Sequence, residues 1–286
     1  MKHYRDIAGD GGSNIVGQVE DQQARLRRRL AGVRFVVAVV SGKGGVGKSS
    51  VAANLASGLA LDGWRVGVLD ADLNGPSMAK LLGVRGRTLA LVGGAVEPPT
   101  TPLGVRVMSM DLLLPDDATP LTWQASTQAE SQTWRGAMEA NGIREFLADT
   151  AWGDLDVLLV DLPPGTDRLV VIAGLVPVLA GTVVVTIPSD ISRLVVRRSI
   201  TVASGLVAPV LGLVENMAGL FPGPGGAELA HEGGIPFLGS IPFDPDLAAA
   251  GDRGEALAVT APARPAAHAF TALARRIRET LERPNR

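Results

Sequence analysis

The chain has no cysteine among its 286 residues. This absence excludes disulfides and any metal site made of the chain's own thiolates, although it does not by itself assign a cellular compartment. The chain also has no large excess of positive or negative charge, because it contains 27 basic and 29 acidic residues and its net charge is −2. The chain therefore lacks the electrostatic character of a protein that binds nucleic acid or acidic lipid in bulk.

One local run of charge, Arg27-Arg28-Arg29, lies in a segment predicted as a short helix over residues 21–30. A run of this kind is typical of a solvated helix face, and contact with nucleic acid is the alternative. We expect no nucleic-acid partner. Residues 1–10 mix acids and bases without an apolar run, so we expect no secretory signal and a cytoplasmic location.

One uncharged stretch, residues 169–187, is long enough to cross a bilayer. However, Gly174, Pro177 and Gly181 interrupt it, and its second half is rich in β-branched residues. A helix followed by a buried parallel strand explains this pattern better than a membrane span does. We predict no membrane span.

Apolar segments alternate with helical patterns along most of the chain. Near-continuous apolar strands between helices predict a doubly wound α/β fold, with a mostly parallel sheet covered by helices on both faces. Residues 83–104 and 111–134 are predicted as long loops, and the chain is divided into an N-terminal extension, 1–32, and one domain, 33–286. The predicted strands are 35–40, 66–69, 105–110, 157–160, 182–187, 210–214 and 237–241, and helices are predicted to begin near Lys48, Arg135, Asp190 and Asp244, with a last one over 266–281.

The most informative motif follows the first predicted strand. The run from Ser41 to Ser49 fits G-x-x-x-x-G-K-[ST], the phosphate-binding P-loop, and a helical pattern follows it as the motif requires. Glycines allow the backbone N–H groups to surround a polyphosphate, Lys48 neutralises the β- and γ-phosphates, and Ser49 offers its hydroxyl to Mg²⁺. The predicted ATP-binding residues of this segment are Gly42, Lys43, Gly44, Gly45, Val46, Gly47, Lys48, Ser49 and Ser50.

A second lysine, Lys43, follows the first glycine of the loop. A side chain on the outer rim of the loop cannot easily fold back onto its own nucleotide. It can reach a phosphate held by a facing subunit and act in trans, as an arginine finger does. This position predicts a catalytic lysine in a face-to-face homodimer, and a solvated surface lysine is the alternative.

Two carboxylates, Asp70 and Asp72, end the second predicted strand on the same side of its pleat. Asp72 is the better candidate for positioning the water that attacks the γ-phosphate. Asp70 is predicted to support the phosphate loop or the metal shell. The alternative for such strand-end aspartates is that they cap the following turn.

A further carboxylate, Asp161, ends an apolar strand and precedes Leu162-Pro163-Pro164-Gly165, as a Walker-B aspartate would. Asp161 is predicted to hold Mg²⁺ together with Ser49, because magnesium keeps several waters and uses few protein ligands. Gly165 is predicted to offer its N–H to the γ-phosphate in a mobile switch.

With these elements in order, the chain resembles the Mrp family of iron–sulfur cluster carrier P-loop ATPases, which are relatives of MinD and ParA. The resemblance covers residues 10–255. The sequences of two segments, Asp70 to Ser77 and Asp161 to Thr166, distinguish Mrp from MinD and ParA. The shared segments are Gly11 to Ile15, Ser41 to Ser49, Asp70 to Ser77, Trp134-Arg135-Gly136, Asp161 to Thr166, Glu215-Asn216-Met217 and Gly234 to Pro242.

The resemblance implies a magnesium-dependent ATPase that serves iron–sulfur cluster assembly or transfer, with apo-client or assembly proteins as partners. It also implies that Lys43 is the family's signature lysine, Asp72 the hydrolytic carboxylate and Asn216 the residue that recognises adenine. An amide suits adenine because it both donates and accepts hydrogen bonds. A turn-forming asparagine is the alternative reading of Asn216.

The chain departs from the family pattern in two places. The family's C-x-x-C pair, whose thiolates would hold a bridging cluster, is replaced by residues 218–226 without any cysteine. This departure argues against direct cluster binding by the family mechanism. After Thr166 the chain has Asp167-Arg168 where the family has Gly-Asp. The main alternative function is a MinD/ParA-like, ATP-switched dimer that controls assembly on a partner or surface.

Overall fold

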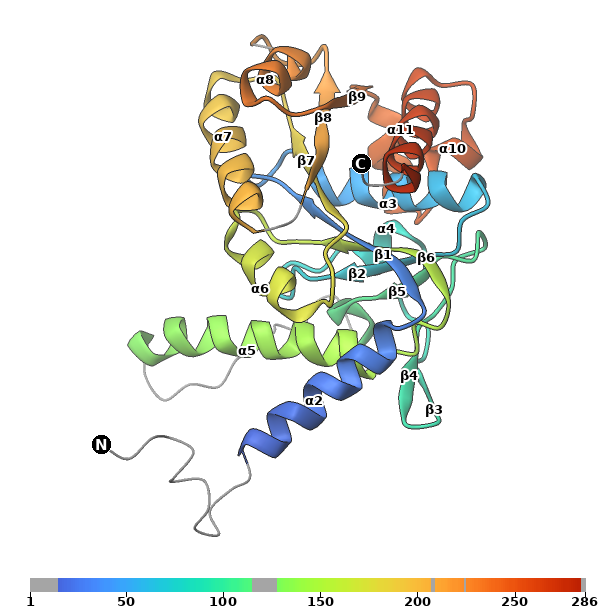
Figure 1. The fold of residues 1–286 in the computed structure, drawn as a ribbon. Helices are drawn as coiled ribbons and strands as arrows, with labels where there is room; N and C mark the ends of the chain where they lie inside the picture. Colours follow the sequence, from blue (N-terminus) through green and yellow to red (C-terminus); the bar gives the residue numbers. More distant parts are fainter. Residues whose placement is uncertain (1–14, 115–127, 207–208, 224, 284–286) are drawn as a thin grey trace, which may run out of the picture.

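The computed structural model describes residues 15–114, 128–206, 209–223 and 225–283. At its centre lies a seven-stranded sheet with the order β5-β2-β6-β1-β7-β8-β9, in which every neighbouring pair is parallel (Figure 1). The doubly wound prediction is thereby confirmed. The strands are β1 (Val33–Val40), β2 (Val66–Asp70), β5 (Arg106–Met108), β6 (Leu155–Asp161), β7 (Gly181–Thr186), β8 (Val210–Ala218) and β9 (Phe237–Pro242).

The sheet separates two hydrophobic clusters, one on each face. Val37 and Val39 of β1 lie in one cluster, whereas Val36, Ala38 and Val40 lie in the other. This alternation follows from the period of two along a strand. Because both faces are covered, the strands have apolar residues on both sides, as a parallel sheet between helices requires.

Helices cover both faces of the sheet, as Figure 1 shows. Residues of α3 and α11 fill the cluster on one face, and residues of α2, α5 and α6 contribute to the other. The first face carries α3 (Lys48–Leu61), α4 (Met78–Leu81), α9 (Pro245–Asp252), α10 (Leu257–Thr260) and α11 (Pro265–Glu282), and the second carries α2 (Ile15–Leu30), α5 (Gln128–Asp149), α6 (Asp167–Leu175), α7 (Asp190–Gly205) and α8 (Gly226–Gly233).

The helix that begins at the P-loop is packed tightly between the sheet and α11. A Cβ placed on Gly58 of α3 would lie 3.1 Å from the Cβ of Ala274, so the absence of a side chain lets the two helices approach closely. Phe270 of α11 is fully buried in the same cluster. Burial of this kind fixes α3, and with it the lysine and serine at its start, against the sheet.

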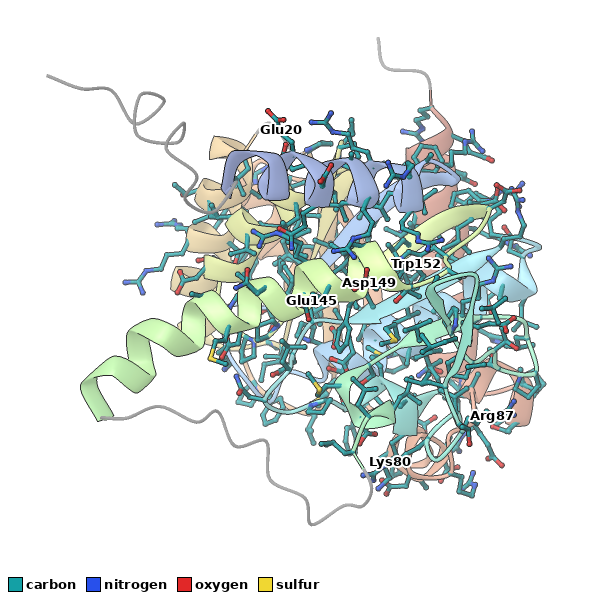
Figure 2. The ribbon with its side chains drawn as sticks, turned by 90° about the horizontal axis from the view of Figure 1, so that it is seen from below. Glu20, Lys80, Arg87, Glu145, Asp149 and Trp152 are labelled. Carbon is teal, nitrogen blue, oxygen red and sulfur yellow. The ribbon has the colours of Figure 1, made fainter. Side chains whose placement is uncertain are left out.

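The helix α2 lies beside α5 across the second face (Figure 2). Leu26 and Leu30 of α2 are buried there, and Arg25 forms an ion pair of 3.3 Å with Asp149 of α5. Part of the predicted N-terminal extension therefore contributes to the core. The division of the chain at residue 32 remains a prediction.

The predicted loops differ from the structure. Residues 128–134 belong to α5, which begins at Gln128 rather than near Arg135. Within 83–104 lies the antiparallel hairpin of β3 (Ala90–Val92) and β4 (Ala95–Glu97), whose turn residues Gly93 and Gly94 both have positive φ. Two adjacent glycines of this kind favour a tight hairpin turn. The rest of the second predicted loop, residues 115–127, lies outside the described residues.

Two other differences concern single elements. The predicted strand 105–110 is shorter, because Ser109 caps a 3-10 turn, η1 (Met110–Leu112), by accepting a hydrogen bond from the N–H of Asp111. The apolar stretch 169–187 contains most of α6 and then β7, as predicted. Among the described residues, no helix combines the length and the apolar character that a membrane crossing needs.

Candidate nucleotide-binding site

The P-loop connects the end of β1 to the start of α3 at the carboxyl edge of the sheet, where ligands of such folds bind. Gly45 and Gly47 have φ values of 78° and 74°, which favour glycine. A Cβ on Gly47 would lie only 2.3 Å from Nδ2 of Asn216. That amide nitrogen donates to the carbonyl of Val46 at 2.9 Å. The end of β8 thus lies directly against the P-loop, and the adenine-recognising role of Asn216 remains a prediction.

Lys48, Ser49 and Asp161 come together as the motifs predicted. Lys48 Nζ lies 2.5 Å from Asp161 Oδ1, and Ser49 Oγ lies 2.6 Å from Asp161 Oδ2. Lys48 is 7% exposed and Asp161 is fully buried. Burial raises the pKa of the Asp161 carboxyl above its ordinary value, while Lys48 and Ser49 act in the opposite direction. The contacts with Lys48 and Ser49 therefore favour the charged form of Asp161 against the effect of burial.

The donor atoms at this point suit magnesium. Ser49 and Asp161 present hard oxygens side by side at the start of a helix. In the part of the chain that the structure describes, no group of three or more His, Cys, Asp or Glu side chains could enclose a metal ion. The two adjacent oxygens of Ser49 and Asp161 fit an ion that takes few protein ligands and completes its shell with water and phosphate oxygens.

The buried carboxylate of Asp70 has a structural role. Its oxygens accept hydrogen bonds from the N–H groups of Asp72, Ser77 and Met78 and from the hydroxyl of Ser109. Burial, and then the charge of Asp161, raise the pKa of Asp70 to about 7, although its hydrogen bonds lower it. These contacts hold the segment after β2 at the start of α4 and match the turn-capping alternative. The predicted support of the phosphate loop is not among them.

Asp72 projects from the segment that Asp70 organises. It is partly buried, and its Oδ1 accepts the N–H of Gly75 at 3.1 Å. Its charge contributes to raising the pKa of Asp161, which indicates that the two carboxylates are close in space. The position at the carboxyl edge beside the P-loop agrees with the predicted hydrolytic role, which remains a prediction.

Lys43 is directed toward the loop after β7. Its Nζ lies 3.3 Å from the hydroxyl of Ser189, and the residue is partly buried. Lys43 is therefore more than a freely solvated surface lysine. Sequence reasoning did not select Ser189, although its place just after a parallel strand, at the edge that carries the P-loop, was a usable signal.

Gly165, the predicted γ-phosphate donor, is engaged elsewhere in this structure. Its N–H donates to the carbonyl of Ser41 at 2.9 Å, and its φ is 103°. Contact with a γ-phosphate would require this bond to open. The segment after Asp161 is thus attached to the base of the P-loop itself.

The segment that replaces the family's cysteine pair lies next to the same edge. Leu220 and Phe221 are 44% and 42% exposed. A Cβ on Gly223 would lie 3.0 Å from the Cα of Ser189, so this segment contacts the loop that holds Lys43. His231 and His268 are exposed, and His3 lies outside the described residues. Nothing in the side chains of residues 218–226 matches the thiolates that clusters require.

These features define a P-loop NTPase with a second lysine in its loop. They are the parallel sheet, the glycine loop before a buried helix, and the lysine and serine that contact a strand-end aspartate. A comparison with protein families agrees. The family described as ParA, NUBPL iron-transfer P-loop NTPase, matches residues 32–278, and the chain belongs to this family.

Two curated relatives cover most of the chain. An iron-sulfur cluster carrier protein of Saccharolobus solfataricus is 39% identical over 277 residues, which are 93% of this chain and 90% of the relative. The cytosolic Fe-S cluster assembly factor NUBP2 of Homo sapiens is 38% identical over 266 residues, which are 87% of this chain and 93% of the relative. These relatives confirm the resemblance that the motifs indicated.

Solved structures show the same architecture. A nucleotide-binding protein from Archaeoglobus fulgidus in complex with ADP is 36% identical, has a TM-score of 0.67, and is matched over 82% of this chain and 92% of its own. The cell division ATPase MinD of Pyrococcus furiosus has a TM-score of 0.64 over 86% of this chain and 99% of its own. At 24% identity the MinD likeness concerns the fold alone.

The environment of Asp70 predicts a pH dependence of stability. The ordinary pKa of this carboxyl is 3.8, and in the folded protein burial raises the pKa to about 7. Between these values the folded protein holds a proton that the unfolded chain has released, so the contribution of Asp70 to stability falls as the pH rises and is constant above the folded pKa. We expect wild type to lose stability relative to Asp70→Asn across this range.

The measurement is urea unfolding of both proteins from about pH 5 to about pH 8. The contributions of other titrating groups to the free energy of unfolding largely cancel when the two proteins are compared. A difference in the free energy of unfolding that stays constant across the range would contradict the raised pKa of Asp70.

Proposed function

We propose that the chain binds Mg-ATP, hydrolyses it slowly to ADP and phosphate, and acts in iron–sulfur cluster assembly or transfer. The observation that carries the ATPase part is the buried constellation of Lys48, Ser49 and Asp161 behind a glycine loop. Family membership supports the assembly role. The relatives named as cluster carrier and cluster assembly proteins support it further.

In this proposal the P-loop amides surround the phosphates, and Lys48 exchanges its contact with Asp161 for the β- and γ-phosphates. Ser49 and Asp161 hold the magnesium ion, which neutralises charge on the phosphates when it is bound. Asp72 orients the attacking water. Asn216 recognises the adenine from the end of β8, beside the loop.

Hydrolysis is tested by two substitutions. Asp72→Asn should lower kcat by about 10²-fold or more and leave ATP binding in place, because the carboxylate acts on the attacking water. Lys48→Ala should remove most hydrolysis and weaken nucleotide binding, because the phosphates lose their main counter-charge. The assay is phosphate release with magnesium, and calorimetry reports the binding of ATP.

Lys80→Ala is the matched control, since this lysine is exposed on α4 and contacts Asp252. It should hydrolyse ATP as wild type does. Phosphate release that persists unchanged in both Lys48→Ala and Asp72→Asn would exclude this site as the ATPase centre.

We also propose that ATP joins two copies of the chain face to face, with Lys43 of each copy acting on the nucleotide of the other. Lys43 would then leave Ser189, which it contacts in the single chain. We expect Lys43→Ala to bind ATP but to lose about 10³-fold in kcat, as removal of a trans-acting cation does. The Lys80→Ala control should keep the wild-type rate.

Light scattering with Asp72→Asn, which holds ATP unhydrolysed, measures the dimer. The mass should double with Mg-ATP and not with ADP. An unchanged mass in both conditions would argue against the trans role of Lys43 and against the MinD/ParA-like, ATP-switched alternative together.

For cluster assembly, the chain supplies no cysteine of its own. We propose that it acts with cysteine-bearing assembly proteins or apo-clients rather than as a carrier by the family mechanism. The location we propose is the cytoplasm, since the relative NUBP2 is named as cytosolic.

The iron and sulfide content of protein purified without oxygen tests this division of roles. We expect no stoichiometric iron and no visible-region absorbance after anaerobic reconstitution, because thiolates are the usual cluster ligands. A reconstituted cluster that stays bound through gel filtration would show that other side chains hold it.

A further inference from the structure

A buried carboxylate outside the nucleotide site, Glu139 of α5, connects two separate segments of the chain. Glu139 is 6% exposed. One of its oxygens, Oε1, accepts a hydrogen bond from Nδ2 of Asn74 at 2.7 Å. The other, Oε2, forms an ion pair with the guanidinium of Arg168. The same guanidinium also reaches the carbonyl of Gly136, one turn earlier on α5, at 3.4 Å.

The two partners of Glu139 belong to the two segments expected to respond to the nucleotide. Asn74 lies two residues after Asp72, in the segment that follows β2. Arg168 is the second residue of α6, which begins directly after the turn that carries Gly165. Figure 1 shows α6 lying against α5 on this face of the sheet. One carboxylate thus joins the segment of the water-positioning aspartate to the segment of the magnesium-binding aspartate.

The energetics make this connection sensitive to position. A carboxylate in a buried place needs its charge compensated, and removing one partner is costly because the charge is then left unpaired. Arg168 supplies the charge, and Asn74 supplies a further hydrogen bond. If either segment moved away from α5, Glu139 would lose a partner, so the two segments are favoured in one relative arrangement.

Arg168 of this contact lies in an unusual part of the sequence. Arg168 falls where the chain departs from the Gly-Asp of the Mrp pattern after Thr166. A one-residue change in this turn could have displaced the segment after Asp161. In the structure the arginine instead reaches back to α5 and fixes the start of α6 there.

We propose that Glu139 and Arg168 are positioning residues for ATP hydrolysis. Through Asn74 they hold the segment after Asp72 and the segment after Asp161 in one relative position. The two segments therefore move together when the nucleotide binds or is hydrolysed. This inference rests on the proposed ATPase function. Apart from each other, Glu139 and Arg168 contact Asn74 after β2 and Gly136 on α5, and neither contact lies in the P-loop. Loss of their ion pair should therefore disturb the arrangement of the hydrolytic groups and not the initial binding of ATP.

The test uses the full chain with Glu139→Gln, Arg168→Gln and the double variant. We expect each single variant to lower kcat on the order of tenfold, because a small misplacement of a reacting group is costly, while KM for ATP stays within about twofold. Arg168→Lys keeps the charge and should restore part of the rate. The double variant should be no slower than the slower single variant, since both remove one interaction.

A matched control is the ion pair of Arg65 and Asp156, with Nη2 and Oδ1 3.1 Å apart. This pair joins the amino ends of β2 and β6, the same two strands that lead into the two segments. Arg65→Gln should leave kcat unchanged. Because its loss also removes a contact between these strands, it separates a general loss of stability from a loss of positioning.

Hydrogen exchange of the free protein supplies a readout independent of turnover. Arg168→Gln should raise the exchange of amides 73–75 as well as those of 165–168 only if Glu139 couples the two segments. If Glu139→Gln does not fold, Asn74→Ala, at an exposed position, replaces it and should raise the exchange of amides 165–168.

Exchange that changes only around the mutated residue, or kcat unchanged in Arg168→Gln, would overturn the proposal. Rate losses that multiply in the double variant would also do so. If wild type hydrolyses no ATP, the proposed function fails, and the exchange experiment still decides whether the two segments are coupled.

Discussion

The contact between Lys48 and Asp161 is the interaction on which the site depends. It joins the first turn of α3 to the end of β6, and these elements are adjacent only because β6 inserts between β1 and β2 in the sheet. A buried ion pair of this kind stabilises the fold little by itself, because desolvation offsets much of the attraction. Its importance here is geometric, because it holds a cation and an anion where we propose that phosphate and magnesium bind.

The surrounding segments are arranged around that point by backbone contacts. Gly165 is bonded to Ser41, and Asn216 to Val46, so the loops after β6 and β8 both touch the P-loop. Asp70 fixes the loop after β2 differently, by accepting hydrogen bonds from the N–H groups of Ser77 and Met78 rather than by contact with the P-loop. A change in the P-loop, such as the proposed binding of a nucleotide would cause, could therefore reach the ends of β6 and β8 through short polar contacts.

The sequence predicted the fold and the central site because both depend on local patterns. Apolar strands of limited length and a glycine motif carry their own signals. The role of Asp70 was different, since it depends on how the chain turns back to Ser77 and on Ser109, which is distant in sequence. The same holds for Glu139, a single acid on a helix whose partners are distant in sequence. The hairpin of β3 and β4 was missed because three-residue strands are too short for an alternating pattern to be distinctive.

The order of strands has a kinetic consequence. In the sheet β1 pairs with β6 and β7, and its register with β6 matches Phe35 to Val157. Such distant pairings slow folding, because a long loop of chain must close before they form. During synthesis, the glycine loop is made before β6 and β7, the two strands that flank β1. At that stage the chain cannot yet form the complete site that binds a ligand. Competence to bind is thus acquired late, and the incomplete sheet leaves open edges during that interval that chaperones would need to shield.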